Sequence, residues 1–362
     1  MTKQSIATNK LIPGMILANS VYNNADQLIL PKGSRITEES ITRLQFYEID
    51  RVLIESLVPI EPLEEDIFLT TYSERVKSSE EFTSFKKQFD DTTETMKFTL
   101  DEVAAGNSSS GLVEELFSSA TNLINTSENN LELLDMLHNM RESDDATYTH
   151  SLNVSIISAI IGRWLHMSEE DINTLTIAAL FHDIGKLLIP QDILQKSSKL
   201  TNEEYEILKT HPYKGYQLLK YSGMGEQIAL AAMQHHERCD GSGYPGKLTK
   251  NNINSFAKII AIADVYDAMT AARAYRGPLC TFEVLSTFES EGYRCYDAAY
   301  LVPFMYNIVN SYINNTVRLN NGQKGEIIMI NKNALSRPVV HCEGQIYHDL
   351  LREKDLKIVA IL

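Results

Sequence analysis

The sequence predicts a mainly α-helical protein with a small β-rich unit at its N-terminus and a short β tail. Two observations carry this prediction. Apolar residues recur at spacings of three and four through most of residues 82–315, as they do along the buried face of a helix. Short apolar runs separated by Pro and Gly turns fill residues 1–60, and strand-like runs return in residues 316–362.

Residues 1–60 make up the predicted N-terminal β-rich unit. Its apolar runs are 11–15 and 28–33, and residues 51–54 are typical of a closing strand. In residues 37–47, apolar residues recur at the period of a helix. No residue in this segment points to a chemical role. A structural appendage is the simpler interpretation, and a regulatory or docking unit is the alternative.

Residues 61–145 form an acidic segment that we expect to be a helical connector. It holds 20 Asp and Glu against 6 Lys and Arg, a balance of −14 within a chain of net charge −15. The rest of the chain is therefore near neutral, and its charge does not exclude an anionic ligand. Helical periodicity in 82–103 and 111–140 predicts a pair of amphipathic helices, either a signalling connector or dimer contact, or a plain solvated hairpin.

Composition limits the class of protein. The 362 residues suffice for two or three domains, and no apolar run approaches the roughly 20 residues that span a bilayer. Residues 1–10 are polar and lack the apolar core of a signal peptide. We expect a cytoplasmic protein without cysteine-bound zinc, because its cysteines show neither close pairing nor Cys-x-x-Cys spacing: Cys239, Cys280, Cys295 and Cys342.

Residues 146–315 predict one helix after another, followed by the β tail in 316–362. Ser168 is placed to cap one helix, Thr201 opens a capping box, and Pro212 suits the first turn of the next helix. The helices expected here are 150–164, 171–181, 201–211, a helix from 212, 226–236 and 256–272; the strand-like runs of the tail are 326–330, 338–341 and 356–362.

Histidines are concentrated in this helical segment. Six of the nine histidines fall within the 87 residues 150–236, and all of these but His166 are taken as candidates at the ends or on the apolar faces of predicted helices. Two carboxylates join them, and one of these lies in an otherwise apolar helix, where an unpaired charge is costly. Each residue alone fits a core or surface position, but a shared metal site explains the whole set: His150, His182, Asp183, His211, His235, His236 and Asp264.

The donor types narrow the metal chemistry. Nitrogen and oxygen donors without thiolates favour Mn, Fe, Zn or Co over a structural zinc site. Seven donors exceed what one tetrahedral ion needs, which suggests two ions sharing a bridging carboxylate. Two such ions can lower the pKa of a bridging water, so that a hydroxide forms, and can clamp the oxygens of a phosphodiester.

These motifs, taken in order, resemble the HD-GYP subfamily of HD-domain phosphohydrolases over residues 146–315. The matching residues are His150, the run His-Asp-Ile-Gly-Lys at 182–186, His-Pro at 211–212, the run from His235 to Pro245, and Ala-Asp-Val-Tyr-Asp-Ala at 263–268. The resemblance implies a helical HD-type domain that binds two divalent ions, Fe or Mn. It also implies a bacterial cytoplasmic enzyme that hydrolyses cyclic di-GMP to linear pGpG and/or GMP.

The resemblance also implies roles for single residues. The seven donors match the metal ligands, with Asp183 as the bridge and a catalytic residue. Lys186 matches a catalytic lysine beside the scissile phosphate, where it also binds substrate. Arg273 and Arg276 match the positions that hold the substrate phosphates, although each alone fits a solvated helix end. Tyr244 either stacks on guanine or packs at the rim.

Two positions depart from the family pattern. Members with a third metal carry a glutamate four residues before the first histidine, where this chain has Ala146. We therefore expect two ions and not three. The usual Asp-Arg-Pro is Ala-Arg-Ala at 272–274, which leaves open how that loop is held.

Two other functions remain as alternatives. One is a cyclic di-GMP receptor with weak or no turnover, and the other is a phosphodiesterase for another cyclic dinucleotide. The complete ligand set favours an enzyme over a receptor. We expect neither a nucleic acid polymer nor a membrane span, and a homodimer through the helical connector is open.

Overall fold

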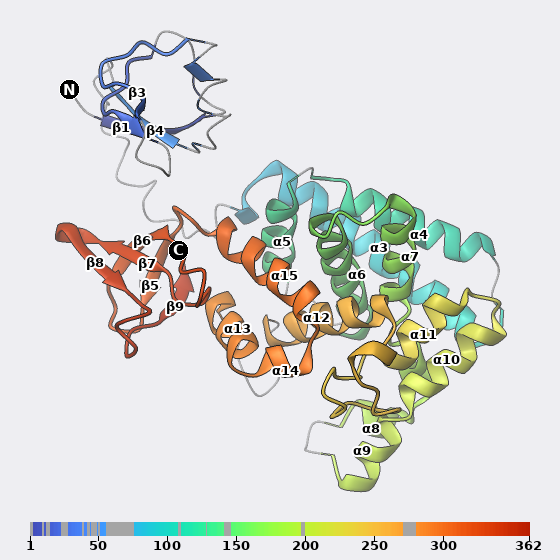
Figure 1. Ribbon diagram of the computed structural model, residues 1–362. Helices are drawn as coiled ribbons and strands as arrows, with labels where there is room; N and C mark the ends of the chain where they lie inside the picture. The colour runs from blue at the N-terminus through green and yellow to red at the C-terminus, as the bar shows by residue number, and fades with distance from the viewer. Residues whose placement is uncertain are drawn as a thin grey trace. The chain divides into compact units, whose positions relative to one another are not determined.

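The protein is described by a computed structural model that covers residues 3–8, 11, 15–22, 28–37, 40–41, 44, 49, 51–55, 76–107, 110–127, 129–140, 146–196, 200–270 and 280–362 (Figure 1). The chain divides into two compact units, Met1–Thr70 and Thr71–Leu362. The prediction of a mainly α-helical protein with small β units near both ends is confirmed.

The N-terminal unit is built from short antiparallel strand pairs. Strand β1 (Lys3–Ala7) pairs with β4 (Arg51–Glu55), and β2 (Val21–Tyr22) pairs with β3 (Leu28–Leu30). The strand predicted at 51–54 is therefore present, whereas the helix predicted at 37–47 lies largely outside the described residues. The buried core of the unit contains Leu11, Leu17, Leu30, Ile36, Leu44, Val52 and Ile54.

The acidic segment is helical, but its second predicted helix is interrupted. Helix α3 (Glu80–Ala104) is followed by α4 (Ser110–Ile124) and α5 (Asn130–Asn139). The prediction of one helix over 111–140 was wrong. Thr126 Oγ1 donates to the Leu123 carbonyl at 2.7 Å, and Ser127 Oγ accepts from the Asn129 amide at 3.0 Å. These side chains replace helical hydrogen bonds and end α4.

Helices α3 to α5 share a hydrophobic core with the helices that follow them. Buried Phe85 and Phe89 of α3 belong to the same cluster as the apolar residues of α6 (Ala146–Trp164). Polar contacts reinforce this packing: Tyr148 Oη donates to Asp101 Oδ1 at 3.0 Å, and Tyr266 Oη lies 3.0 Å from His138 Nε2. The connector therefore packs directly on the helical domain.

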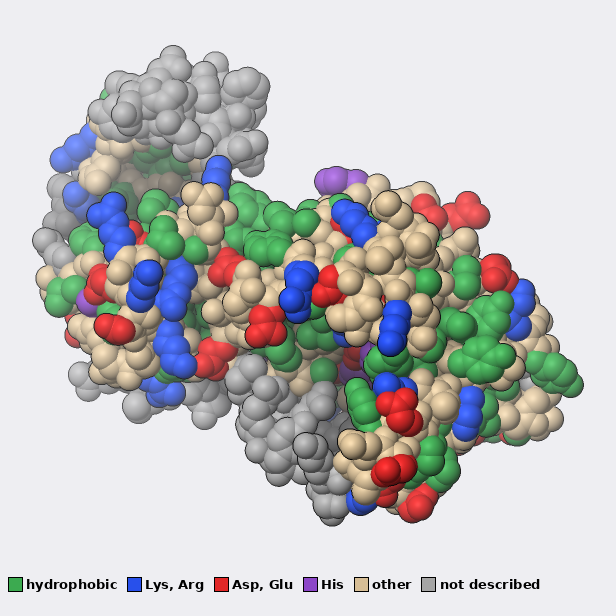
Figure 2. All heavy atoms as spheres, turned by 60° about the horizontal axis from the view of Figure 1, so that its bottom comes forward, with side chains coloured by type: hydrophobic (Ala, Val, Ile, Leu, Met, Phe, Trp, Pro, Cys, Tyr) green, Lys and Arg blue, Asp and Glu red, His purple; other side chains and the backbone are tan. Residues whose placement is uncertain are grey.

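The helical domain follows the predicted order. Ser168 caps its helix by accepting from the Asp171 amide, Thr201 forms both bonds of a capping box, and Pro212 lies in a first turn. On one face, acidic and basic side chains are interspersed over these helices (Figure 2). The elements are α7 (Glu169–Leu180), the 3₁₀ helix η3 (Ile184–Leu188), α8 (Gln191–Leu194), α9 (Asn202–Leu208), α10 (His211–Tyr221), α11 (Glu226–Gln234), the 3₁₀ helix η4 (Lys250–Asn252) and α12 (Ser255–Thr270).

The chain ends in a second helical group and a five-stranded antiparallel sheet of order β8-β7-β6-β5-β9. Strands β5 and β8 were not among the predicted runs. The elements are α13 (Thr281–Thr287), the π-helix η5 (Phe288–Gly292), α14 (Tyr293–Cys295), α15 (Ala298–Ser311), β5 (Thr316–Leu319), β6 (Lys324–Met329), β7 (Val339–Cys342), the 3₁₀ helix η6 (Glu343–Gln345), β8 (Ile346–Asp349) and β9 (Ile358–Ile361).

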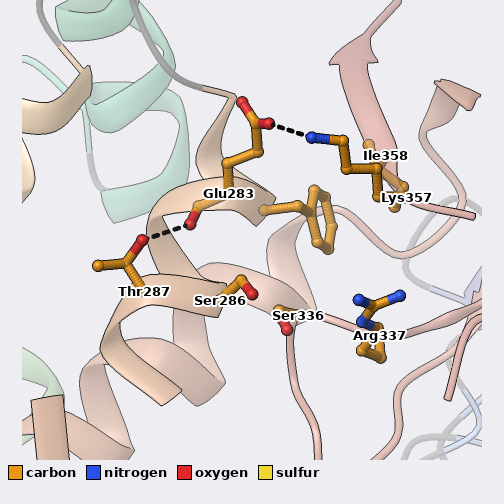
Figure 3. A pocket seen from close by; sticks show the side chains of 8 residues that line it. Glu283, Ser286, Thr287, Ser336, Arg337, Lys357 and Ile358 are labelled. Carbon is orange, nitrogen blue, oxygen red and sulfur yellow. Dashed lines mark hydrogen bonds and ion pairs between the residues drawn. The ribbon is translucent and has the colours of Figure 1, made fainter. Parts of the chain in front are cut away.

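A cavity of about 310 Å³ lies where this sheet meets α13 (Figure 3). Lys357 Nζ is 3.0 Å from Glu283 Oε1 across it. Arg337 Nη1 donates to the carbonyls of Lys354 and Leu356 at 3.2 and 2.8 Å. These charged groups are paired with protein atoms, and the Lys357–Glu283 pair ties the β unit to α13.

No helix in the described part of the chain has the length and apolar character needed to cross a membrane. All four cysteines carry free thiols.

Candidate metal centre

Five separate elements supply the seven predicted ligands, and the structure brings all seven together. They come from α6, from the turn between α7 and η3, from the start of α10, from the end of α11 and from α12. Their donor atoms form two groups, and within each group the atoms lie within 4.8 Å of one another. One group is Asp183, His211, His235 and His236, and the other is His150, His182 and Asp264.

Asp183 lies between the two groups. Its Oδ1 atom is 3.2 Å from His211 Nε2 and 3.5 Å from His235 Nε2. Its Oδ2 atom is 3.3 Å from His182 Nε2 and 3.9 Å from His150 Nε2. The carboxylate thus presents one oxygen to each group, which is the arrangement expected of a bridging ligand.

Three of the histidines are oriented by the helix ends on which they lie. His182, His211 and His235 each place Nδ1 within 2.7–2.8 Å of the carbonyl three residues earlier. A carbonyl only accepts, so each Nδ1 carries the proton and each Nε2 presents a lone pair to the cluster. Such outer hydrogen bonds fix the tautomer and ring direction of metal-binding histidines.

The nitrogen and oxygen lone pairs that converge in the cluster are suited to binding a cation. His211 Nε2 and His235 Nε2 are 3.4 Å apart, and both approach Asp183 Oδ1. Three acceptors without a proton between them repel one another. Moreover, His182 Nε2 and Asp183 Oδ1 are buried and have no hydrogen-bond partner among the described residues. A divalent cation in each group would satisfy these atoms.

Asp267 is part of the site although no role was predicted for it. It lies one helical turn after Asp264, and its Oδ2 is 2.8 Å from His150 Nδ1. Asn153 Nδ2 donates to the other oxygen at 3.1 Å. Asp267 therefore accepts the Nδ1 hydrogen bond of His150, as a backbone carbonyl does for His182, His211 and His235. The i, i+3 spacing of two acids on one apolar helix is the sequence signal that could have revealed it.

The charge states favour metal binding at most of the ligands. Burial works against ionisation of Asp183, but Lys186 and His182 hold its pKa well below the usual range. Burial lowers the pKa of His235 to about 4, with Asp183 opposing the shift. His150 is the exception: burial opposes its protonation, yet hydrogen bonds to Asp264 and Asp267 raise its pKa to about 10. Metal binding must therefore displace a proton from His150.

Gly185 and Lys186 follow the His-Asp pair, and the structure gives a reason for each of them. The Lys186 ammonium forms an ion pair with Asp183 Oδ2, and its side chain is about one quarter exposed. A Cβ atom on Gly185 would lie 1.9 Å from the His211 carbonyl oxygen. Only glycine allows η3 to approach the start of α10 so closely, and this approach brings His211 next to Asp183.

The Gly-Tyr-Pro loop is held against the histidine pair. The ring of Tyr244 stacks on that of His236, with centroids 4.7 Å apart and an interplanar angle of 27°. The buried carboxylate of Glu237 accepts from the amides of Gly246 and Leu248 at 2.5 and 2.8 Å. Tyr244 thus packs against a candidate ligand, and the alternative role predicted for it, stacking on guanine, stays a prediction.

The two predicted phosphate-binding arginines, Arg273 and Arg276, lie outside the described residues, because α12 ends at Thr270 and the description resumes at Cys280. Their role stays a prediction.

Residues 120–300 match the family model for the HD domain. The chain belongs to the HD-domain family. The predicted resemblance to the HD-GYP subfamily is confirmed by this match and by the curated relatives. The fold is also similar to that of "Bd1817, a HDG"Y"P protein" from Bdellovibrio bacteriovorus, with a TM-score of 0.52 and 18% identity over 84% of this chain and 98% of that one.

Curated relatives cover part of this chain. A cyclic di-GMP phosphodiesterase of Thermotoga maritima is 38% identical over 180 residues, 48% of each protein. The cyclic di-GMP phosphodiesterase response regulator RpfG of Xanthomonas campestris is 41% identical over 137 residues, 37% of this chain and 36% of RpfG. The 3'3'-cGAMP-specific phosphodiesterase 1 of Vibrio cholerae is 37% identical over 145 residues, 40% of this chain and 34% of that enzyme. The matched region thus spans half or less of the length of these relatives.

Proposed function

We propose that the protein is a metal-dependent phosphodiesterase that hydrolyses cyclic di-GMP to linear pGpG and/or GMP. The observation that carries this proposal is the placement of Asp183 between two groups of histidine and carboxylate donors. The relatives named cyclic di-GMP phosphodiesterases support the choice of substrate.

The residues would hold two divalent ions, for which Fe or Mn suits the mixed nitrogen and oxygen donors. His211, His235 and His236 would hold one, and His150, His182 and Asp264 the other, with Asp183 shared. Two ions would supply an activated water at neutral pH and charge neutralisation at the phosphate.

The protein's own groups would position the substrate and stabilise charge. The Lys186 ammonium lies beside the shared carboxylate, where it can contact a phosphate oxygen as negative charge develops. Arg273 and Arg276, which follow the ligand helix α12, are the proposed clamp for the two phosphates. Asp267 would keep the ring of His150 in its binding orientation.

The assembly and location belong to the proposal as well. We assign residues 1–60 to an N-terminal unit, 61–145 to a helical connector, 146–315 to the catalytic domain and 316–362 to the β extension. The connector is the proposed homodimer contact, since Phe98 on α3 is 58% exposed. A cytoplasmic location fits a second-messenger substrate, and a nucleic acid polymer is not a proposed partner.

A second function is a phosphodiesterase for a different cyclic dinucleotide. The relatives that are specific for 3'3'-cGAMP support this second function. A cyclic di-GMP receptor with little turnover is the third option, and the complete ligand set counts against it.

The test is incubation of the Mn- or Fe-loaded protein with cyclic di-GMP, followed by chromatography of the products. We expect pGpG or GMP from the parent, and neither from Asp183→Ala, which should also bind less metal. Asp192→Ala, which removes an exposed carboxylate on α8, is the matched control and should behave like the parent. Binding of cyclic di-GMP without any product would favour the receptor, and turnover of 3'3'-cGAMP alone would favour the second function.

A further inference from the structure

Helix α9 and the residue that follows it place a tyrosine and a lysine on the side of the Gly-Tyr-Pro loop. Tyr205 and Lys209 are four residues apart, so they project from the same face. Lys209 Nζ lies 5.3 Å from the ring centroid of Tyr205 and 5.8 Å from that of Tyr244. Helices α8 and α9 project from the lower end of the domain in Figure 1. The three side chains form one cluster, which we name the α9 rim: Tyr205, Lys209 and Tyr244.

The α9 rim borders the metal centre. Tyr244 stacks on His236, and Lys209 is two residues before His211. Both histidines belong to the donor group that contains Asp183. A substrate whose phosphate reaches this group therefore brings its attached nucleoside near the rim.

The two tyrosines of the rim are not equally available. Lys209 lies near both rings, but Tyr244 already stacks on the His236 ring. Tyr205 has 48% of its surface exposed. The ring that an incoming base can stack on is therefore Tyr205, rather than the Tyr244 of the sequence-based prediction.

Lys209 can change partners at little cost. Its Nζ is 2.6 Å from Glu206 Oε1, but the Glu206 side chain is 68% exposed. An ion pair with such an exposed acid contributes little to stability. The ammonium is therefore free to turn toward an acceptor on a ligand that stacks beside it.

We infer that the α9 rim selects guanine, with Tyr205 stacking on one base of the dinucleotide and Lys209 donating to its O6 and N7 atoms. This inference rests on the proposed phosphodiesterase function and names the base that the same site prefers. Lysine carries only donors. Guanine offers two acceptors, O6 and N7, on one edge, whereas adenine places an amino donor where guanine has O6. Lys209 therefore favours guanine over adenine.

The test compares cyclic di-GMP, 3'3'-cGAMP and cyclic di-AMP on metal-loaded protein, by kcat/KM and by equilibrium binding. Lys209→Met should lower the preference for cyclic di-GMP over cyclic di-AMP by about 10-fold, as expected for loss of a charged hydrogen bond. Lys209→Arg should retain the preference, because arginine also donates to O6 and N7. Lys220→Met is the matched control, since Lys220 forms a similar exposed ion pair with Glu226 on a different helix.

Tyr205 should act differently from Lys209. Stacking depends weakly on which base is stacked, so Tyr205→Leu should weaken all three dinucleotides by similar factors, and Tyr205→Phe should restore them. Metal content should stay at the parent value in every variant.

An unchanged selectivity ratio in Lys209→Met would overturn the inference, and so would an equal loss for all three ligands, which indicates a phosphate contact or a structural effect. The proposed function fails separately if the parent turns over none of the three. Binding ratios then still test the rim, and a parent that binds none of them refutes both.

Discussion

Gly185→Ala should move His211 away from Asp183 within one donor group of the metal centre. A Cβ atom at this position would lie 1.9 Å from the His211 carbonyl oxygen and 2.6 Å from the Gly215 amide nitrogen. Both neighbours are backbone atoms, so η3 and α10 must move apart by about 1.5 Å to reach an ordinary contact near 3.4 Å. Overpacking usually costs about 1–3 kcal/mol, and a backbone clash belongs at the upper end. At roughly 2–4 °C per kcal/mol, Tm should fall by about 6–12 °C.

Metal binding should fall together with stability. The His211 Nε2 atom lies 3.2 Å from Asp183 Oδ1, and a shift between their elements would spoil that approach. Circular dichroism melting and elemental analysis measure the two effects. Gly111→Ala is the control: Gly111 lies in α4 with no atom within 4 Å of the added carbon, so Tm should hold or rise slightly. If Gly185→Ala keeps the parent's Tm and metal content, the close approach does not position the site.

Three further predictions concern ligands, ions and pH. Arg273→Ala and Arg276→Ala should each weaken cyclic di-GMP binding by about 1.5–3 kcal/mol in calorimetry, with metal content unchanged; parent-like binding would place the clamp elsewhere. Elemental analysis should find two ions in the parent and three in Ala146→Glu, since residue 146 begins α6, one turn before His150; three ions in the parent would contradict this. In the metal-free protein, the raised pKa of His150 stabilises the fold fully below pH 6.5, and this stability is lost as the pH rises through about 10. Urea unfolding at several pH values, compared with His150→Gln, checks that window, and parallel pH profiles of the two proteins would refute it.

Much of the candidate metal centre was predictable from sequence because most of its residues lie at or near helix ends. Histidines or an aspartate stand near an end of four predicted helices, and Asp264 lies inside an otherwise apolar one, so that together they indicate a shared site. The caps were predictable for a similar reason: Ser168 and Thr201 carry side-chain oxygens in the right place relative to their apolar runs.

Other features depend on contacts that periodicity does not report. Asp267 resembles any acid near the end of a helix until its carboxylate meets His150 from another element, 117 residues away in sequence. Strand β8 carries exposed Ile346 and Tyr347, so it lacks the buried alternation that marks a strand. The break after α4 arises from Ser127 and its neighbours, whose polar side chains are tolerated in many helices.

The helices before residue 146 include one that contacts the ligand-bearing helix α12 directly. Tyr266 lies between Asp264 and Asp267 on α12, is fully buried, and meets His138 of α5 at 3.0 Å. The ligand helix is thus packed on one side by a residue of the connector. The HD-domain match, which begins at residue 120 within α4, includes this contact. His138 of α5 therefore supports the ligand helix at Tyr266, the residue that separates its two acids, without itself being a candidate ligand.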